Sequence, residues 1–190
     1  VAGVVGEMLT ECYQIYCPAL RNEDESFFHE SVSFGQGLQM VNILKDIHTD
    51  HEHSACWLPR KVFENHGCSL DCLTESRKDS AYASAIRELV SIAHGHLCHA
   101  LNYTLRIPPQ ESGIRNFCLW SIGMAVLTLR NIYQKPDFTH SSEIKITRRD
   151  VKKLIFFCRI FAGSDRALRL GFRTITRSLP TTTIDLPISR

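Results

Sequence analysis

The stretch from Gly35 to Asp50, GQGLQMVNILKDIHTD, has the hydrophobic pattern of an amphipathic helix. Its apolar side chains recur at steps of three and four residues, which is the spacing of one helix face. They are Leu38, Val41 and Leu44, with Ile43 and Ile47 beside them. No alternating pattern of apolar and polar residues, typical of half-buried strands, stands out along the chain. The sequence therefore predicts an all-α fold, a bundle of helices around one core.

Three oxygen-bearing side chains lie along one side of this predicted helix. Asn42, Asp46 and Asp50 follow one another at four-residue steps, which separates successive side chains by about 40° around the helix and about 6 Å along it. Two carboxylates this close repel each other unless a cation lies between them. Mg²⁺ accepts one or two carboxylates and completes its shell with water and substrate phosphates. The stripe predicts a magnesium site, although the spacing taken alone is more typical of a solvated acidic helix end.

The residues around the stripe resemble a known motif. Gly35–Pro59 resembles the second aspartate-rich motif of the squalene/phytoene synthase family. The opening segment Val1–Glu7, VAGVVGE, resembles the segment that precedes this motif, and Gly113–Leu129 resembles a later helix of bacterial squalene-synthase-like members. The likeness extends to about Ile155. It implies a helical bundle of the class I isoprenoid synthase type, of which this chain is the C-terminal portion.

The resemblance implies a prenyltransferase reaction. In this family two farnesyl or geranylgeranyl diphosphates condense head to head, and Mg²⁺ assists the loss of diphosphate. Squalene synthases then reduce the product with NADPH, whereas phytoene and dehydrosqualene synthases need no reductant. A degenerate, non-catalytic scaffold of the same fold is a further alternative. Because the first aspartate motif is expected in an N-terminal half that is missing here, the chain alone is expected to bind metal and diphosphate poorly.

The position of each residue in the motif implies its role. Asp46 and Asp50 are implied to be the magnesium ligands and, together with Asn42, the catalytic residues. The implied substrate-binding residues are Gln39, Lys45, Trp57, Gly3 and Gly6. The two glycines are also expected to be points of close helix packing.

The motif departs from the family pattern at four positions. Lys45 stands where the family usually has arginine, which keeps the charge but loses the bidentate geometry. The following loop reads Ser54-Ala55-Cys56-Trp57 where the family usually has Gly-Arg-x-Tyr. Ala55 therefore removes a cation that would face diphosphate, and Trp57 replaces a phenol with a larger aromatic ring.

A second cationic cluster lies at Ile144–Arg149, IKITRR. It resembles a stretch linked to NADPH binding in squalene synthases, with Thr147 in place of an arginine. Thr147 and Asp150 have the spacing of a capping box at the start of a last helix. Cations in the first turn of a helix are electrostatically unfavourable unless an anion lies there. We therefore predict that Lys145 and Arg148 contact the phosphates of NADPH, the alternative being a solvated basic turn.

Composition limits the remaining possibilities. A net charge of +2 over 190 residues argues against nucleic-acid binding. The longest nearly apolar run, Phe117–Leu129, is too short to cross a bilayer and predicts a core helix. Most of the eight cysteines lie in apolar helical patterns, which indicates a reducing compartment. We expect a cytoplasmic protein with a peripheral membrane contact for product release.

The predicted organisation is one helical domain over residues 1–179, followed by a loosely held tail over residues 180–190. Proline, glycine and capping residues delimit the predicted helices. These helices run over Val1–Cys17, from an N-cap at Asn22 to His53, over Arg60–Asn65, from Ser76–Asp79 to Pro108, over Pro109–Gln134, and onward from Thr147.

Overall fold

The computed structural model describes residues 2–70 and 79–186, and within these ranges the chain is helical without any strand. The α-helices are α1 (Ala2–Tyr16), α2 (Glu25–Glu52), α3 (Arg60–Asn65), α4 (Ser80–Arg106), α5 (Ser112–Gln134), α6 (Arg148–Phe161) and α7 (Asp165–Thr176). Two short 3-10 turns, η1 (Pro18–Asn22) and η4 (Ser141–Ile144), connect them. The predicted all-α fold is confirmed.

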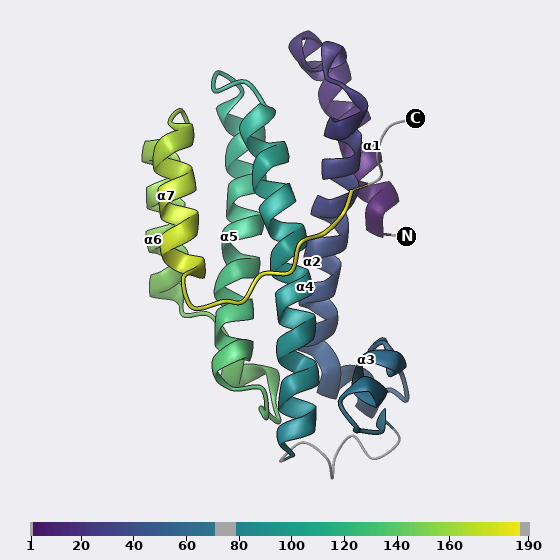
Figure 1. Ribbon diagram of the computed structural model, residues 1–190. Coiled ribbons are helices and arrows are strands. Elements are labelled where there is room, and N and C mark those ends of the chain that lie inside the picture. The colour runs from purple at the N-terminus through teal and green to yellow at the C-terminus, as the bar shows by residue number, and fades with distance from the viewer. Residues whose placement is uncertain (1, 71–78, 187–190) are drawn as a thin grey trace.

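The long helices α2, α4 and α5 form the centre of the bundle (Figure 1). Helix α1 packs on α2, while α6 and α7 pack on the far side of α5. Each central helix buries its apolar face, and α4 is buried along nearly its whole length. Helix α5 is long and apolar enough to cross a membrane by composition, but over half of it is buried inside the bundle. Its central position was predicted from its nearly continuous apolar sequence.

Two predictions about the helices are wrong, one boundary and the identity of the last helix. Asn22 does not cap α2, because Pro18 starts a 3-10 turn that runs through Asn22. Asp24 caps the helix instead, and its carboxylate accepts a hydrogen bond from the Phe27 amide at 3.3 Å. Thr147 does cap α6, accepting from the Asp150 amide at 3.1 Å. However, α6 is not the last helix.

Helix α6 ends at Phe161, and the chain reverses before Ser164 caps α7. The expected start of α4 is close to the observed one, since Asp79 occupies the N-cap position. Ser76, the earlier limit of that prediction, lies outside the described residues.

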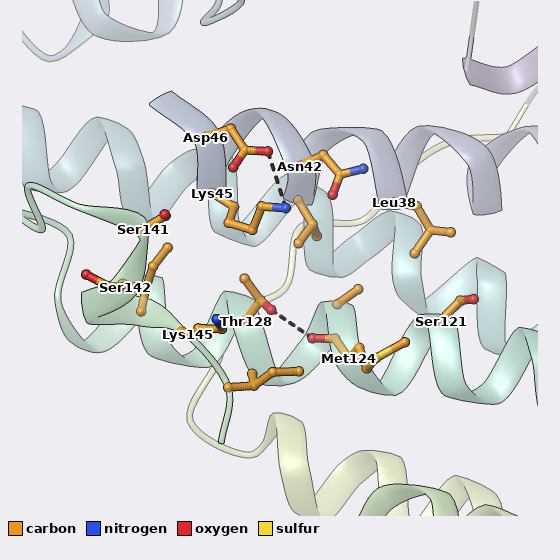
Figure 2. Close-up of a pocket in the computed structure, with 14 residues that line it drawn as sticks. Leu38, Asn42, Lys45, Asp46, Ser121, Met124, Thr128, Ser141, Ser142 and Lys145 are labelled. Carbon is orange, nitrogen blue, oxygen red and sulfur yellow. Dashed lines mark hydrogen bonds and ion pairs between the residues drawn. The ribbon is translucent and has the colours of Figure 1, made fainter. Parts of the chain in front are cut away.

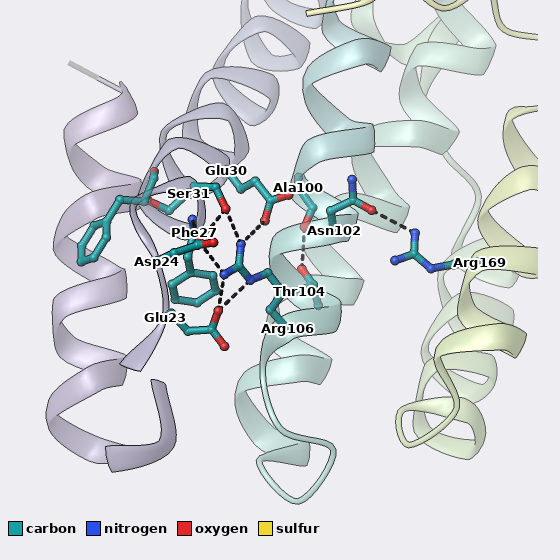
Figure 3. A network of polar contacts seen from close by, with 12 residues as sticks. Glu23, Asp24, Phe27, Glu30, Ser31, Ala100, Asn102, Thr104, Arg106 and Arg169 are labelled. Atoms are coloured by element: carbon teal, nitrogen blue, oxygen red, sulfur yellow. Dashed lines mark hydrogen bonds and ion pairs between the residues drawn. The ribbon is translucent and has the colours of Figure 1, made fainter. Parts of the chain in front are cut away.

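A group of charged residues joins the start of α2 to the end of α4 (Figure 3). Arg106 donates to Glu23, to Asp24 at 2.7 Å and to the Ser26 hydroxyl at 2.7 Å. Hydrogen bonds from Ser26 and Arg106 lower the pKa of Asp24 to about 2. Burial raises the pKa of nearby Glu30, although Arg106 opposes this effect. The cluster fixes the angle at which α2 enters the bundle.

Glycines allow α1 and α2 to approach each other closely. A Cβ atom on Gly6 would lie 1.9 Å from the Ser31 carbonyl oxygen, and one on Gly3 would lie 2.8 Å from Val32 Cγ1. On α2, a Cβ on Gly35 would lie 2.1 Å from the Ala2 carbonyl oxygen. The predicted close packing at Gly3 and Gly6 is confirmed, and α1 can contact α2 here only without side chains.

We expect Gly6→Ala to destabilise the bundle by about 1–3 kcal/mol, because the new methyl group must push two helix backbones apart. Gly113→Ala is the matched control. Gly113 also lies in a helix, but a Cβ there has no atom within 4 Å, so alanine should be neutral or slightly stabilising. Urea unfolding of both variants measures the difference. Equal stabilities would show that the α1–α2 contact does not limit folding.

The segment after α7 does not match the expected loose tail. It crosses the bundle (Figure 1) and is hydrogen-bonded to α4 up to Ile184. His94 Nδ1 lies 2.8 Å from the Pro180 carbonyl oxygen, and the Ser91 and Thr182 hydroxyls are 2.6 Å apart. Gly95 makes the approach possible, since a Cβ there would lie 2.4 Å from the Thr182 carbonyl oxygen. A threonine- and proline-rich composition does not reveal such partners, and residues 187–190 lie outside the described residues.

The contact at His94 predicts a dependence of stability on pH. Burial lowers the pKa of His94 from its usual value near 6.5, and within the described part of the chain its buried Nε2 atom has no hydrogen-bond partner. The folded state therefore binds fewer protons than the unfolded chain, so stability is lost as pH falls through about 6.5. We expect a lower urea midpoint at acidic pH. His94→Asn, which keeps an N–H donor without titrating, should flatten this dependence, and an unchanged slope would contradict the assignment.

Candidate active site

A pocket of about 660 Å³ lies between α2, α5 and the η4 turn (Figure 2). Helix α2 contributes polar side chains to one wall, and α5 and the turn form the opposite wall. Its polar lining residues are Asn42, Lys45, Asp46, Ser121, Thr128, Ser141, Ser142 and Lys145. Apolar side chains of α2 and α5, together with Ile144 and Ile146, complete the lining. The pocket therefore joins the predicted aspartate motif to the second cationic cluster.

Helix geometry explains why Asn42 and Asp46 face the pocket. Val41 and Leu44 are buried in the core. Asn42 and Asp46 lie one helical turn apart from each other, at the side of this buried face, and therefore border the pocket. Asp46 remains 37% exposed and lies 3.3 Å from the Lys45 ammonium nitrogen. The pocket wall therefore offers a carboxylate, an amide and an adjacent cation, all within reach of solvent.

Lys145 faces the pocket because its turn is fixed to α5. The preceding residue, Ile144, is buried, and its carbonyl oxygen accepts a hydrogen bond from Asn131 at 3.0 Å. Glu143 closes the turn by accepting from the Thr139 amide at 2.8 Å and from Lys135. The hydrogen bond from Lys135 is the largest cause of the lowered pKa of Glu143. Lys145 is thus held opposite the α2 wall (Figure 2).

The structure separates residues that the sequence grouped together. Arg148 is an exposed residue at the start of α6 and does not line the pocket with Lys145. Asp50 also lies outside this pocket, in a narrow recess formed with Ala55, Trp57 and neighbouring residues. The chain turns back here, since the Ala55 amide donates to the Asp50 carbonyl oxygen at 2.9 Å. Asp46 and Asp50 therefore lie on one stripe but border different hollows.

An apolar groove of about 720 Å³ adjoins the polar pocket. Gln39, Trp57 and Gly6 line it together with apolar side chains of α1 and α2, whereas Gly3 does not. Those side chains include Val5, Leu9, Leu38 and Ile43, and Phe117 of α5 also lines the groove. Asn42 and Leu38 line both hollows. A long apolar ligand with an anionic head could therefore place its chain in the groove and its head beside Asn42 and Asp46.

The sequence did not reveal four hydroxyl groups in the pocket. Ser121 and Thr128 lie on α5, while Ser141 and Ser142 lie on the η4 turn. Thr128 donates to the Met124 carbonyl oxygen at 2.9 Å, so only its acceptor capacity is free for a ligand. Serines in a short loop carry no spacing signal, and their contribution depends on how the turn folds against α5.

Comparison with known proteins agrees with this geometry. The family model described as squalene/phytoene synthase matches residues 1–150. The chain belongs to the squalene/phytoene synthase family. This match covers both α2, which carries the aspartate stripe, and the turn that carries Lys145.

Similar curated proteins are fungal squalene synthases. Squalene synthase ERG9 of Candida albicans is 31% identical over 166 residues, which cover 86% of this chain and 36% of that protein. Squalene synthase ERG9 of Gibberella zeae is 28% identical over 161 residues, covering 83% of this chain and 33% of that protein. The squalene synthase of Cyberlindnera jadinii is 28% identical over 176 residues, covering 92% and 39%. The chain thus spans little more than a third of the length of these relatives.

Proposed function

We propose that the protein containing this chain is a squalene synthase-like prenyltransferase that condenses two farnesyl diphosphates head to head. The observation that carries the proposal is the junction of the apolar groove with the polar pocket at Asn42. A prenyl diphosphate has the same division into a long apolar chain and an anionic head. Membership of the squalene/phytoene synthase family supports this substrate class.

The residues of the α2 stripe fit a magnesium ion in their donor chemistry. Asp46 and Asp50 offer carboxylate oxygens and Asn42 an amide oxygen, all of the hard type that Mg²⁺ prefers. Within the described residues no three His, Cys, Asp or Glu side chains cluster closely enough to hold a metal unaided. Mg²⁺ usually needs only one or two carboxylates when substrate phosphates complete its shell. When bound, it would neutralise charge on the departing diphosphate.

The chain's own residues would bind the diphosphate and exclude water. Lys45 and Lys145 lie on opposite walls of the pocket and can neutralise phosphate oxygens from two sides. The hydroxyls of Ser141 and Ser142 can donate to the same oxygens. Leu38, Ile43 and Phe117 give the groove an apolar lining, which would protect an allylic cation from water.

NADPH-dependent reduction to squalene is the finer part of the proposal, and it rests on Lys145. This cation lines the pocket in which the condensed product would lie, whereas Arg148 does not line it. A phytoene or dehydrosqualene synthase would use the same pocket without a reductant, and Lys145 would then contact only diphosphate. A non-catalytic scaffold would bind prenyl diphosphate without turnover.

Product analysis of the full-length protein distinguishes these functions. Purified protein is incubated with farnesyl diphosphate and Mg²⁺, with and without NADPH, and the products are identified by mass spectrometry. We expect diphosphate release in both cases and squalene only with NADPH. Dehydrosqualene under both conditions would establish the reductant-free reaction. Tight substrate binding with no diphosphate release would establish a scaffold, and geranylgeranyl diphosphate tests for a longer substrate.

A further inference from the structure

Basic residues gather on the α6–α7 edge of the molecule, the edge away from α1 in Figure 1. Residues 147–177 contain nine lysines and arginines but only two aspartates. The whole chain has 22 basic and 20 acidic residues, so the remainder carries 13 basic and 18 acidic ones. The small net charge thus conceals a cationic edge on an otherwise acidic protein.

Most cations on this edge are available to a partner, while Arg169 donates a hydrogen bond to the Asn102 side chain at 2.9 Å. All nine are exposed, and within the described ranges none of them forms an ion pair. The two aspartates do not compensate for them, because both are engaged. Asp165 pairs with fully buried Arg115 at 2.5 Å, and Asp150 accepts from the Thr147 hydroxyl at 2.6 Å.

Large apolar side chains are exposed among these cations. Phe156 is 68% exposed and Leu170 is 67% exposed. On α6, Lys152, Phe156 and Arg159 follow one another at helical steps of four and three residues, so they share one outward face. Ile160, which is 55% exposed, extends the apolar part of this face. Such a face has the composition of segments that lie at a lipid–water interface.

A groove beside this face offers further apolar surface. It lies between α5, α6 and α7, has a volume of about 620 Å³ and is lined largely by leucine, isoleucine and phenylalanine. Leu170 and Phe161 belong both to its lining and to the exposed apolar residues. Lys153, Arg130 and Asp150 also line it, so its charged lining groups carry a net positive charge and an acyl chain in the groove would leave its anionic headgroup near two cations and one carboxylate.

We propose that the outward face of α6 and α7 docks on a membrane surface that carries anionic lipids. Its cations attract the headgroups, and Phe156, Ile160 and Leu170 enter the interface. Nucleic acid fits less well, because it would neutralise the cations but leave these apolar side chains in water. The inference does not depend on the reaction in the pocket, since none of these three residues lines it.

Vesicle co-sedimentation of the full-length protein tests the proposal. The probes are vesicles of phosphatidylcholine alone and vesicles with about one third phosphatidylserine. Lys152→Glu/Arg159→Glu should weaken binding to the anionic vesicles by about tenfold or more, because both changes replace attraction by repulsion. High salt should reduce the wild-type binding as well. Phe156→Ser/Ile160→Ser should weaken binding at constant charge.

The matched control is Lys61→Glu/Arg87→Glu, which changes the net charge equally at exposed positions on α3 and α4. It should bind anionic vesicles nearly as well as the wild type. All the substituted α6 residues are exposed, so circular dichroism should show an unchanged fold. Equal weakening by the control, or equal wild-type binding to neutral vesicles, would overturn the proposal. The proposal would also be overturned if the wild type bound a short DNA duplex but no vesicles, and if Phe156→Ser/Ile160→Ser kept this DNA binding.

Discussion

Asp46→Asn is expected to lower turnover of the full-length protein by about 10²–10³-fold while leaving its stability nearly unchanged. Asparagine has almost the same shape but lacks the charge that would hold a cation against the diphosphate. Asp46 lines the main pocket and is partly exposed, so the substitution buries no unpaired group. Initial rates of diphosphate release with saturating farnesyl diphosphate measure the effect. Titration with Mg²⁺ should also show a higher half-saturating concentration.

Asp50→Asn is expected to act in the same direction, and Glu52→Gln is the control for both. Glu52 is an exposed acid on the last turn of the same helix and lines neither hollow. Because Asp50 borders a separate recess, the comparison shows whether both carboxylates act on one ion. Near-normal turnover in both aspartate variants would remove the stripe from the mechanism. A loss in Asp46→Asn alone would restrict the metal role to the main pocket.

The sequence predicted those features of the fold that short-range patterns determine. Arg60–Asn65 was predicted as a helix with its observed bounds, and Thr147 was predicted as a helix cap. Capping and periodicity depend on neighbours within a few residues, so one sequence is enough. The Asn22 cap was wrong because Pro18 begins a 3-10 turn that includes Asn22, and Asp24, which caps the helix instead, is held by Arg106 from the end of α4. The docked tail depends likewise on His94, 86 residues away from Pro180.

The same reasoning explains what the sequence revealed of the site. The α2 stripe follows from the helical repeat, so Asn42 and Asp46 could be placed on one face. No local pattern indicates that Lys145 lies across the pocket from them while Arg148 does not line the pocket. The two cations differ because Lys145 directly follows buried Ile144, whereas Arg148 already belongs to α6. The roles of all these residues remain predictions.

Lys145→Ala is expected to separate condensation from reduction. A charge-assisted hydrogen bond to phosphate contributes about 1.5–3 kcal/mol, so its loss should raise the KM for NADPH by about 10–100-fold. Condensation of the two farnesyl diphosphates should continue, and unreduced products should accumulate. Steady-state rates at varied NADPH, together with the ratio of squalene to dehydrosqualene, measure the effect.

Arg148→Ala tests whether both cations bind NADPH, as the sequence predicted, or only Lys145, as the pocket lining predicts. The sequence assigned both cations to NADPH, but only Lys145 lines the pocket. Arg148 lies on the first turn of α6 with its side chain exposed, so the structure predicts nearly normal reduction in this variant. Equal losses in both variants would mean that NADPH spans the start of α6 as well as the pocket. If Lys145→Ala raises the KM for farnesyl diphosphate but leaves that for NADPH unchanged, Lys145 binds the departing diphosphate and the basic turn has no part in reduction.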